Sequence, residues 1–412
     1  MNFIYKVRSK YAAPVSSWAL VLMLVFLPYS RTLGTVGILL FVLAAVLIPG
    51  PLRIKITWPL LALWVLSLIG LAWTSQQDYG MNLLIRQLPL LLIPLAFGKV
   101  PEVSGPMLRK STWVFTGSLA VASLLTLVLG WLEFQKTGEY KSLFYHDLSG
   151  QIGLSALYLS LFVVMASALL IRQIFESETT RTQLILSGFC LLFFLGMLVL
   201  LSARASILAW LFLAFFSLIW FWKNPKSRFI KYAIPIVLLI GAAAVFTVPL
   251  LRERFQEAIN FENRFSLAGF GGGTSFRLAK WESAWKCIQA APLFGHGTGD
   301  VQFVLDQQYK IEGKFQLLDY NAHNQYLQTW LGLGLPGLLL LMASFFTLIR
   351  YSKDRFLALA FSGIWGICIF TESMLQTQKG IYFFALFYCL LATVSGSPGS
   401  DLPKASNHSP DK

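Results

Sequence analysis

Long apolar runs constrain the fold of this sequence more than any other feature. We find twelve of them, each roughly 15 to 24 residues long, and about 20 apolar residues form a helix that crosses a bilayer. Because 56% of the residues are hydrophobic and only 13% are charged, the sequence predicts an all-α, polytopic membrane protein with about 12 transmembrane helices. The approximate bounds of the runs are 13–29, 33–49, 56–73, 82–98, 111–131, 150–171, 183–201, 205–222, 230–250, 326–349, 356–371 and 380–396.

The formal net charge of +14 would suggest a nucleic-acid partner for a soluble protein, but the positions of the basic residues argue against one. If the N-terminus is cytoplasmic, most Lys and Arg residues fall in cytoplasmic segments. The short segments on the outer side carry only Arg31, Lys136, Lys141, Arg204 and Lys379. Short loops rich in Lys and Arg resist translocation. We therefore expect cytoplasmic N- and C-termini and no nucleic-acid partner.

A single membrane domain is expected over residues 1–396, with a long helical outer loop, 251–325, inserted between the ninth and tenth helices. Eight acidic residues offset the eight basic residues of this loop. The remaining residues, 397–412, are rich in Ser and Pro, a composition typical of disorder, and form the expected cytoplasmic tail. The N-terminal stretch is basic and then apolar, with no small-residue cleavage site after Pro28, which indicates an uncleaved anchor.

Part of the outer loop has the pattern of a surface helix. The segment between three glycines at 271–273 and Pro292 predicts a helix of about four turns. Arg277, Trp281 and Trp285 share one face of it, and such a face suits the membrane interface. Arg277 falls in the first turn, where free N–H groups favour an anion, and its guanidinium could hold a phosphate. Alternatively, Arg277 reaches lipid headgroups.

Two further outer-side groups are candidates for chemistry. Arg204 lies in a tight turn between the seventh and eighth runs, where a charge beside hydrocarbon is costly and therefore a functional candidate. The alternative is an interfacial anchor. His323, with Asn324 beside it, begins the tenth run, and imidazole is the usual group to take a proton from a hydroxyl. The alternative is a histidine that only fills the first turn of a helix.

Three glycines interrupt the tenth run. Gly332, Gly334 and Gly337 lie at the spacing of small residues that lets a neighbouring helix or a lipid tail come close. Pro336 can bend the same helix. We expect Gly334 and Gly337 to serve helix packing.

Weaker candidates are Arg86 inside the fourth run, His146 before the sixth, and Glu372 and Lys379 between the last two runs. For His146, Glu372 and Lys379, ordinary interfacial solvation is the commoner use, whereas a buried Arg86 near the outer side could meet phosphate. The sequence contains no Gly-rich nucleotide loop, no HExxH and no paired Asp motif, and its four cysteines have no metal-type spacing. We therefore expect neither metal nor nucleotide cofactor.

Two motifs resemble those of a known family, the O-antigen ligases. The stretch from His323 and Asn324 through nine residues to Gly334 and Gly337 is similar to their pattern H-[N/S/Q]-x9-G-x-x-G. The segment RASIL, which begins at Arg204, is similar to their R-x3-L element. The run of an arginine, two tryptophans and PLFGHGTG in residues 275–299 resembles the loop of the wider ligase and polymerase superfamily.

This resemblance implies a fold and an activity. Members transfer a glycan from an undecaprenyl-pyrophosphate carrier to an acceptor hydroxyl at the periplasmic face of the bacterial inner membrane, without metal or nucleotide. By similarity, Arg204 and Arg277 hold the pyrophosphate and His323 is the base. The candidate supporting residues are Asn324, Arg86, His146, Glu372 and Lys379.

Several functions stay open at this stage. The spacing of nine residues after Asn324 favours a ligase that acts on a lipid A core acceptor. An O-antigen or exopolysaccharide polymerase would use the same donor, with a second lipid-linked glycan as acceptor. A protein glycosyltransferase of the superfamily is less favoured. Such a protein usually carries a sizeable soluble region after the last helix, and here only a short polar tail is expected at 397–412. A twelve-span transporter would place its ionisable groups near the bilayer midplane, whereas here they gather at the outer side.

Overall fold

A computed structural model describes residues 2–29, 31–48, 51–176, 178–224, 252 and 274–395. These residues are predominantly helical, and the one β-bridge among them joins Val103 to Val394. The α-helices are α1 (Asn2–Phe26), α2 (Arg31–Val46), α3 (Trp58–Ile69), α4 (Gln77–Arg86), α5 (Pro89–Lys99), α6 (Gly105–Thr137), α7 (Tyr145–Gly150), α8 (Ala156–Ile174), α9 (Arg181–Leu201), α10 (Arg204–Trp220), α13 (Thr274–Ala290), α14 (Val301–Ile311), α15 (Gln325–Tyr351), α16 (Arg355–Phe370) and α17 (Gln378–Ala392). Short 3-10 turns are η1 (Gly70–Trp73), η2 (Tyr140–Leu143), η4 (Phe315–Leu317) and η5 (Met374–Gln376).

The helices agree with a multi-pass membrane protein. Five helical segments are long and apolar enough to cross a bilayer: Gln77–Lys99, Gly105–Thr137, Ala156–Ile174, Arg181–Leu201 and Gln325–Tyr351. Six shorter apolar helices lie at 14–26, 32–46, 58–73, 204–220, 355–370 and 378–392. Eleven of the twelve expected runs therefore overlap a described apolar helix. The ninth run, the first part of the outer loop and the tail at 397–412 lie outside the described residues, so the span count stays a prediction.

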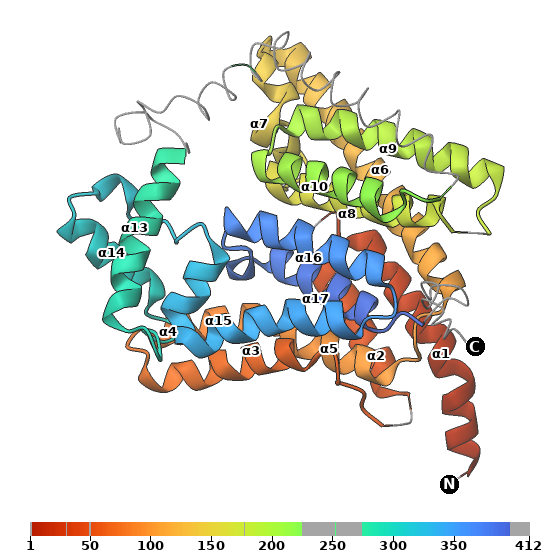
Figure 1. The fold of residues 1–412 in the computed structure, drawn as a ribbon, viewed down its shortest axis with the longest axis horizontal. Coiled ribbons are helices and arrows are strands. Elements are labelled where there is room, and N and C mark those ends of the chain that lie inside the picture. Colours follow the sequence, from red (N-terminus) through yellow and green to blue (C-terminus); the bar gives the residue numbers. More distant parts are fainter. Residues whose placement is uncertain are drawn as a thin grey trace, which may run out of the picture.

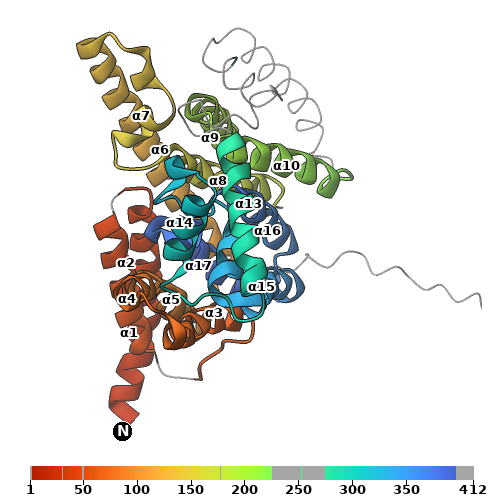
Figure 2. The same ribbon diagram turned by 90° about the vertical axis from the view of Figure 1, so that its left-hand side faces the viewer.

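The helices form a bundle with a cap at one end. α15 packs against α3 and α16, and α10 packs against α16 and α8. Figure 1 shows α3, α15, α16 and α10 running in similar directions, with α13 and α14 gathered at one end of them. In Figure 2, which looks toward that end, α13 lies across the bundle helices. The cap therefore covers the end of the bundle at which α15 begins.

The most buried helices are α8 and α17. Nearly all residues of both are buried, which fits helices that are apolar on every side. Aromatic rings fill the space between α17 and its neighbours, and Trp365 of α16 stacks on Phe384 with ring centroids 4.9 Å apart. These two helices form the core around which the others are arranged.

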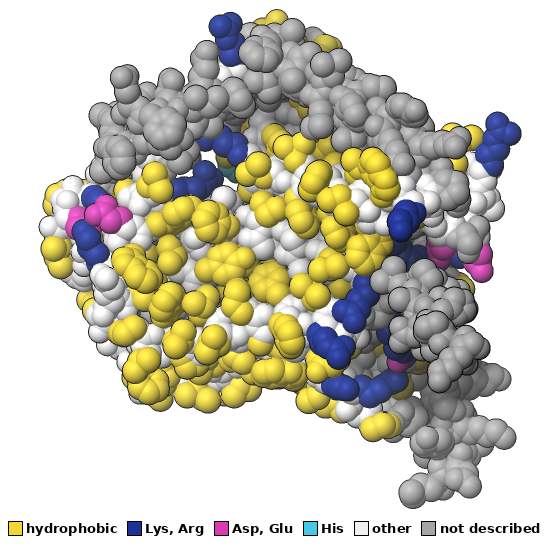
Figure 3. All heavy atoms as spheres, in the orientation of Figure 1, with side chains coloured by type: hydrophobic (Ala, Val, Ile, Leu, Met, Phe, Trp, Pro, Cys, Tyr) yellow, Lys and Arg dark blue, Asp and Glu magenta, His cyan; other side chains and the backbone are white. Residues whose placement is uncertain are grey.

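The outer helices expose apolar stripes. On α15, Leu335, Leu339, Met342 and Phe346 are exposed and follow one face at helical spacing. Figure 3 shows a broad band of hydrophobic side chains across the middle of the molecule, with Lys and Arg side chains on both sides of the band. The exposed stripe of α15 is suited to contact lipid tails.

Ion pairs hold the cap together. Glu312, after α14, accepts hydrogen bonds from Lys314 at 2.6 Å, from Ser283 at 2.6 Å and from Gln308 at 2.7 Å, and Lys286 lies 3.1 Å away. Burial raises the pKa of Glu312, but these hydrogen bonds outweigh burial and bring the pKa to about 2. The carboxylate is therefore ionised at neutral pH and joins α13 to α14.

This network makes the cap sensitive to acid. Because the pKa of Glu312 is lower in the folded protein than its ordinary value, the carboxylate stabilises the cap above about pH 4.5 and loses this effect as the pH falls toward 2. Replacing Glu312 with Gln should destabilise the packing of α13 on α14 by roughly 2 kcal/mol at pH 7. We expect lower hydrogen-exchange protection in both helices of this variant. Glu282→Gln, at the exposed end of the network, is the control and should change protection little; equal effects of the two variants would contradict the central position of Glu312.

Candidate functional site

The loop that precedes α14 packs against a break in α15. Gly334 has φ 65° and ψ −166°, a conformation available essentially to glycine alone. Pro336 has no N–H, so the carbonyl of Gly332 lacks its helical donor, and Gly297 N donates to it at 3.0 Å. Leu335 N donates outside the helix, to Pro292 O at 3.1 Å. The loop thus replaces the hydrogen bonds that the break removes.

The same loop fills the space beside the glycines. His296 N donates to Leu331 O at 2.9 Å, and its ring Nε2 lies 2.8 Å from Cys287 O. A Cβ on Gly334 would lie 2.1 Å from Leu293 O. The segment that approaches Gly334 is therefore a loop, where we had expected a helix or a lipid tail. At Gly337 the nearest atoms belong to the preceding turn of α15 itself.

The far end of the loop is fixed to the bundle by Asp300. Its two carboxylate oxygens accept hydrogen bonds from Ser75 N at 2.8 Å and from Gln76 N at 2.7 Å, at the start of α4. Thr298 Oγ1 donates to Ser67 O at 2.6 Å. The loop is thus held by α15 on one side and by the α3–α4 connection on the other, which fixes the position of α13.

Asn324 is the N-cap of α15. Its side chain accepts hydrogen bonds from Tyr326 N at 2.9 Å and Leu327 N at 3.2 Å, which satisfies donors that a helix leaves unpaired at its start. Asn324 N donates to Ser373 Oγ at 3.2 Å. Asn324 therefore positions the start of α15 against the segment that follows α16.

His323 is paired with Glu372 from that segment. His323 Nδ1 lies 3.0 Å from Glu372 Oε2, and about a quarter of the imidazole surface is exposed. His323 has a left-handed backbone with φ 44°, and its N–H donates to Asn321 Oδ1 at 2.9 Å. A carboxylate at Nδ1 favours the tautomer with its proton there. Nε2 is then the nitrogen that can accept a proton.

Glu372 is held in its ionised form. Burial raises its pKa, but the hydrogen bond and charge of His323, the N–H of Ser373 and the charge of Arg277 together lower the pKa below its ordinary value. A carboxylate beside an imidazole orients the ring and stabilises its protonated form. This geometry leaves Nε2 of His323 available to accept a proton, and the sequence alone had suggested Glu372 only as a weak supporting candidate.

The first half of α13 brings two cations to this pair. Arg277 acts electrostatically on Glu372, and its buried Nε has no hydrogen-bond partner in the described part of the chain. Lys280 is buried, with Nζ 4.4 Å from the centroid of the Tyr320 ring. Burial lowers the pKa of Lys280, Glu372 raises it and Arg277 lowers it, which gives a value of about 8. The sequence analysis missed Lys280, although it lies one turn after Arg277.

The tryptophans of α13 pack on the bundle. Trp281 contacts Phe370, the last residue of α16, with ring centroids 5.0 Å apart. Trp285 contacts Trp330 of α15 at 5.6 Å. The face that predicted an interfacial helix thus anchors α13 over the ends of α15 and α16.

Arg204 begins α10 at the same end of the bundle. α10 and α16 run antiparallel, because Phe216 stacks on Phe356 at 5.5 Å and Phe212 contacts Gly363 farther along α16. Extended along both helices, this pairing places Arg204, the first residue of α10, near Phe370, the last residue of α16. The structure therefore brings Arg204, Arg277 and His323 to one end of the bundle from three separate helices.

The other supporting candidates contact the backbone of neighbouring segments. Arg86 Nη1 donates to Gln376 O at 2.8 Å. Lys379, which is buried, donates to Leu27 O at 3.3 Å and to the carbonyl oxygen of Tyr29. His146 Nδ1 accepts a hydrogen bond from Ala156 N at 3.2 Å, at the start of α8. Arg86 and Lys379 both hold the end of the α16–α17 segment that leads into α17, and His146 holds the junction of α7 with α8.

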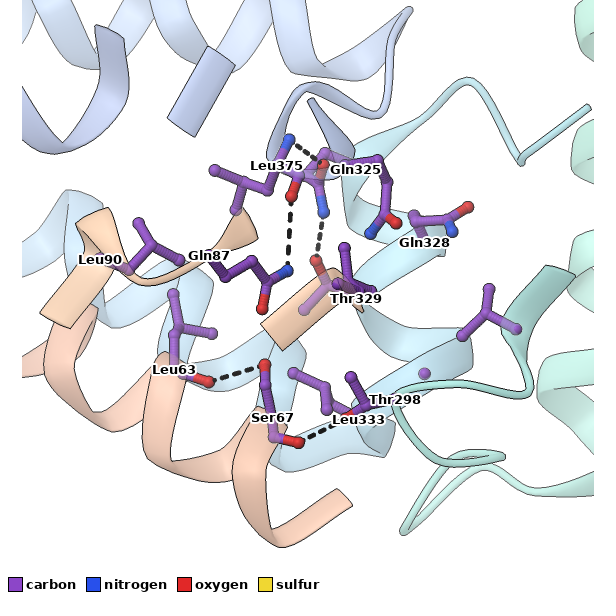
Figure 4. Close-up of a pocket in the computed structure, with 14 residues that line it drawn as sticks. Leu63, Ser67, Gln87, Leu90, Thr298, Gln325, Gln328, Thr329, Leu333 and Leu375 are labelled. Carbon is purple, nitrogen blue, oxygen red and sulfur yellow. Dashed lines mark hydrogen bonds between the residues drawn. The ribbon is translucent and has the colours of Figure 1, made fainter. Parts of the chain in front are cut away.

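A small cavity with both polar and apolar lining adjoins the site. Gln87, Gln325 and Thr329 line it with other side chains from α3, α5 and α15 (Figure 4), and its volume of about 30 Å³ suits about two waters. Gln325 accepts a hydrogen bond from Leu375 N at 2.7 Å and donates to Thr329 at 2.9 Å. The cavity side chains thus hold η5, just after Glu372, against the first turn of α15. In the described residues, no group of three or more His, Cys, Asp or Glu side chains could hold a metal ion.

Comparison with known proteins finds similarity in part of the chain. The family model described as O-Antigen ligase matches residues 189–342, a range that contains Arg204, Arg277 and His323. This match confirms the resemblance seen in the two sequence motifs. An uncharacterized protein of Haemophilus influenzae is 30% identical over 126 residues, which cover 28% of this chain and 30% of the relative. The chain thus matches about a third of the length of that relative.

Because the loop packs directly against Gly334, a methyl group at this position should lower the stability of the protein severely. Replacing Gly334 with Ala would strain the backbone and place a carbon 2.1 Å from Leu293 O, so we expect a loss of roughly 3 kcal/mol or more. The melting temperature in detergent should fall strongly. Gly196→Ala on α9 is the matched control, because no atom lies within 4 Å of its added carbon; similar melting temperatures for the two variants would refute the packing described here.

Proposed function

We propose that this chain, whose residues 189–342 match the O-antigen ligase family model, is a membrane glycosyltransferase of the ligase type. Its donor would be a glycan on undecaprenyl pyrophosphate, and its acceptor a hydroxyl group of the lipid A core. The single observation that carries the proposal is the pair formed by His323 Nδ1 and Glu372 Oε2 at 3.0 Å, with Arg277 acting on the same carboxylate. A base beside a cationic anion site is what transfer from a pyrophosphate requires.

The proposed reaction is a single displacement. His323 Nε2 takes the proton of the acceptor hydroxyl as its oxygen attacks the anomeric carbon of the donor sugar. The bond between that carbon and the pyrophosphate oxygen breaks, and the oxygen keeps the electron pair. Arg204 and Arg277 stabilise the negative charge on the leaving pyrophosphate. Glu372 keeps the proton of His323 on Nδ1 and stabilises the imidazolium that forms.

We propose that the site faces the periplasm and that the protein lies in the bacterial inner membrane. Exposed basic side chains gather around the ends of α15 and α16 that lie away from the site: Lys55 and Arg350 flank the ring of Tyr351, and Lys353 pairs with Glu102 at 2.7 Å. Figure 3 shows basic side chains at that side of the apolar band. Cytoplasmic segments are the ones rich in Lys and Arg, which supports placing the cap outside.

The contact between His323 and Glu372 predicts a complete loss of activity when His323 is replaced and a partial loss when Glu372 is replaced. His323→Ala should abolish glycan transfer, because the base is removed. Glu372→Gln should lower the transfer rate by about 10²- to 10⁴-fold, because an amide can hold the imidazole in the wrong tautomer and cannot stabilise its positive charge. Transfer rates of the purified variants in nanodiscs check this. Lys286→Gln, a cap variant outside the site, controls for handling losses, and normal transfer by His323→Ala would remove His323 as the base.

Product analysis decides the acceptor. The purified protein would be mixed with an undecaprenyl-pyrophosphate oligosaccharide, with and without lipid A core. We expect glycan on the core and free undecaprenyl pyrophosphate. Longer lipid-linked chains that form without the core would instead indicate a polymerase, whose acceptor is a second lipid-linked glycan. A donor that stays intact in both mixtures would refute the glycosyltransferase assignment.

A further inference from the structure

Lys280 is a buried cation without a carboxylate of its own. Only 4% of the residue is exposed, and its Nζ lies 4.4 Å from the centroid of the Tyr320 ring. Among the described residues, no oxygen atom accepts a hydrogen bond from this ammonium group. By contrast, Lys286 on the same helix and Lys314 each pair with both Glu282 and Glu312. The ammonium group keeps a narrow opening to the site, and with so little access to water and no acceptor it is unfavourable unless a ligand supplies acceptors.

Arg277 adds a second positive charge next to Lys280. It precedes Lys280 by three residues on α13, so the two side chains are neighbours on the helix surface. Its Nε is also buried with no acceptor within the described part of the chain. The carboxylate that acts on both cations, Glu372, already accepts hydrogen bonds from His323 and Ser373 N. Two adjacent cations repel each other, and this arrangement suits an anion that carries more than one charge.

We propose that Lys280 is a further ligand of the donor's pyrophosphate, binding beside Arg277 and opposite His323. Its ammonium group donates hydrogen bonds to phosphoryl oxygens and stays protonated throughout the transfer. As the anomeric carbon leaves the pyrophosphate, the oxygen that keeps the electron pair gains charge, and the ammonium stabilises it. The Tyr320 ring, which joins α13 to the start of α15, holds the ammonium in place. This assignment rests on the proposed function.

Lys280 would also make donor binding depend on pH. The charged and titratable groups that face it in the described structure are Arg277, Glu372 and Tyr320, with His323 bonded to Glu372. The pKa of Lys280 in the empty site is about 8, and a bound anion raises it because the anion favours the charged form. Binding is therefore strongest below about pH 8 and weakens by up to about tenfold for each pH unit above it.

The test measures binding of undecaprenyl pyrophosphate itself to the full-length protein in nanodiscs between pH 7 and pH 9.5. Lys280→Gln should bind about 10- to 100-fold more weakly than the natural protein at pH 7, as expected for a lost charged hydrogen bond. Lys280→Arg should retain most of the affinity and lose the part of the pH dependence above pH 8, because arginine stays charged. Lys286→Gln changes the same charge on the same helix and should bind normally.

Thermal unfolding of the empty protein separates a ligand from a structural residue. Because Lys280→Gln removes an unpaired buried charge, its melting temperature should equal or exceed that of the natural protein. A lower melting temperature together with unchanged binding would make Lys280 structural and overturn the assignment. The pH profile of Lys280→Arg remains decisive even if Lys280→Gln does not fold: a profile like that of the natural protein would also overturn it.

Two further outcomes have distinct meanings. If the natural protein fails to bind undecaprenyl pyrophosphate, the proposed function fails. If the natural protein and Lys280→Gln bind it equally, only the role of Lys280 fails. Phosphatidylglycerol vesicles without the polyprenyl lipid test the other source of phosphate, because a loss of vesicle binding equal to the loss of pyrophosphate binding would assign Lys280 to phospholipid headgroups and overturn the proposal.

Discussion

The exchange of backbone hydrogen bonds at Gly334 is the constraint on which the site depends. A helix that contains Pro336 has a carbonyl without a donor, and a membrane offers no water to satisfy it. Here the loop supplies Gly297 N and His296 N to α15 and takes the N–H of Leu335 in return. The loop is consequently fixed in one register, and α13, which ends at the loop, is fixed with it. Together with the tryptophan contacts of α13, this exchange sets the position of the α13 cations near Glu372.

The site is built from helix ends, and polar contacts hold the segment that carries Glu372 against them. Asn324 caps α15 with its side chain and donates its N–H to Ser373 Oγ. The next residue, Gln325, accepts a hydrogen bond from Leu375 N. Arg86 binds the carbonyl of Gln376 from the side of α4. These contacts hold the segment that follows α16 against the start of α15. Glu372 is thereby placed beside His323.

Much of the fold could be predicted from hydrophobic runs, because a bilayer imposes helix length directly on the sequence. The helix containing Arg277 was also predictable, since glycines and Pro292 bound it. The partnership of His323 with Glu372 was not, because it joins residues 49 positions apart and depends on the register of two helix ends. Lys280 escaped notice for a related reason: a lysine in a polar loop is usually solvated, and only tertiary packing buries it. The same packing explains why Gly334 meets a loop, since sequence spacing describes close approach without naming the partner.

The break in α15 also divides the helix mechanically. Its first part, up to Leu333, is held by the loop and by η5, whereas its second part exposes an apolar stripe from Leu335 to Phe346. A helix is stiff only where its hydrogen bonds are continuous, and at Gly334 they pass to another segment. The second part also has a buried side, where Thr347 Oγ1 lies 2.7 Å from Tyr388 OH of α17. The break therefore lets one helix serve two surroundings: its first part receives the loop, and its second part lies between α17 and the lipid.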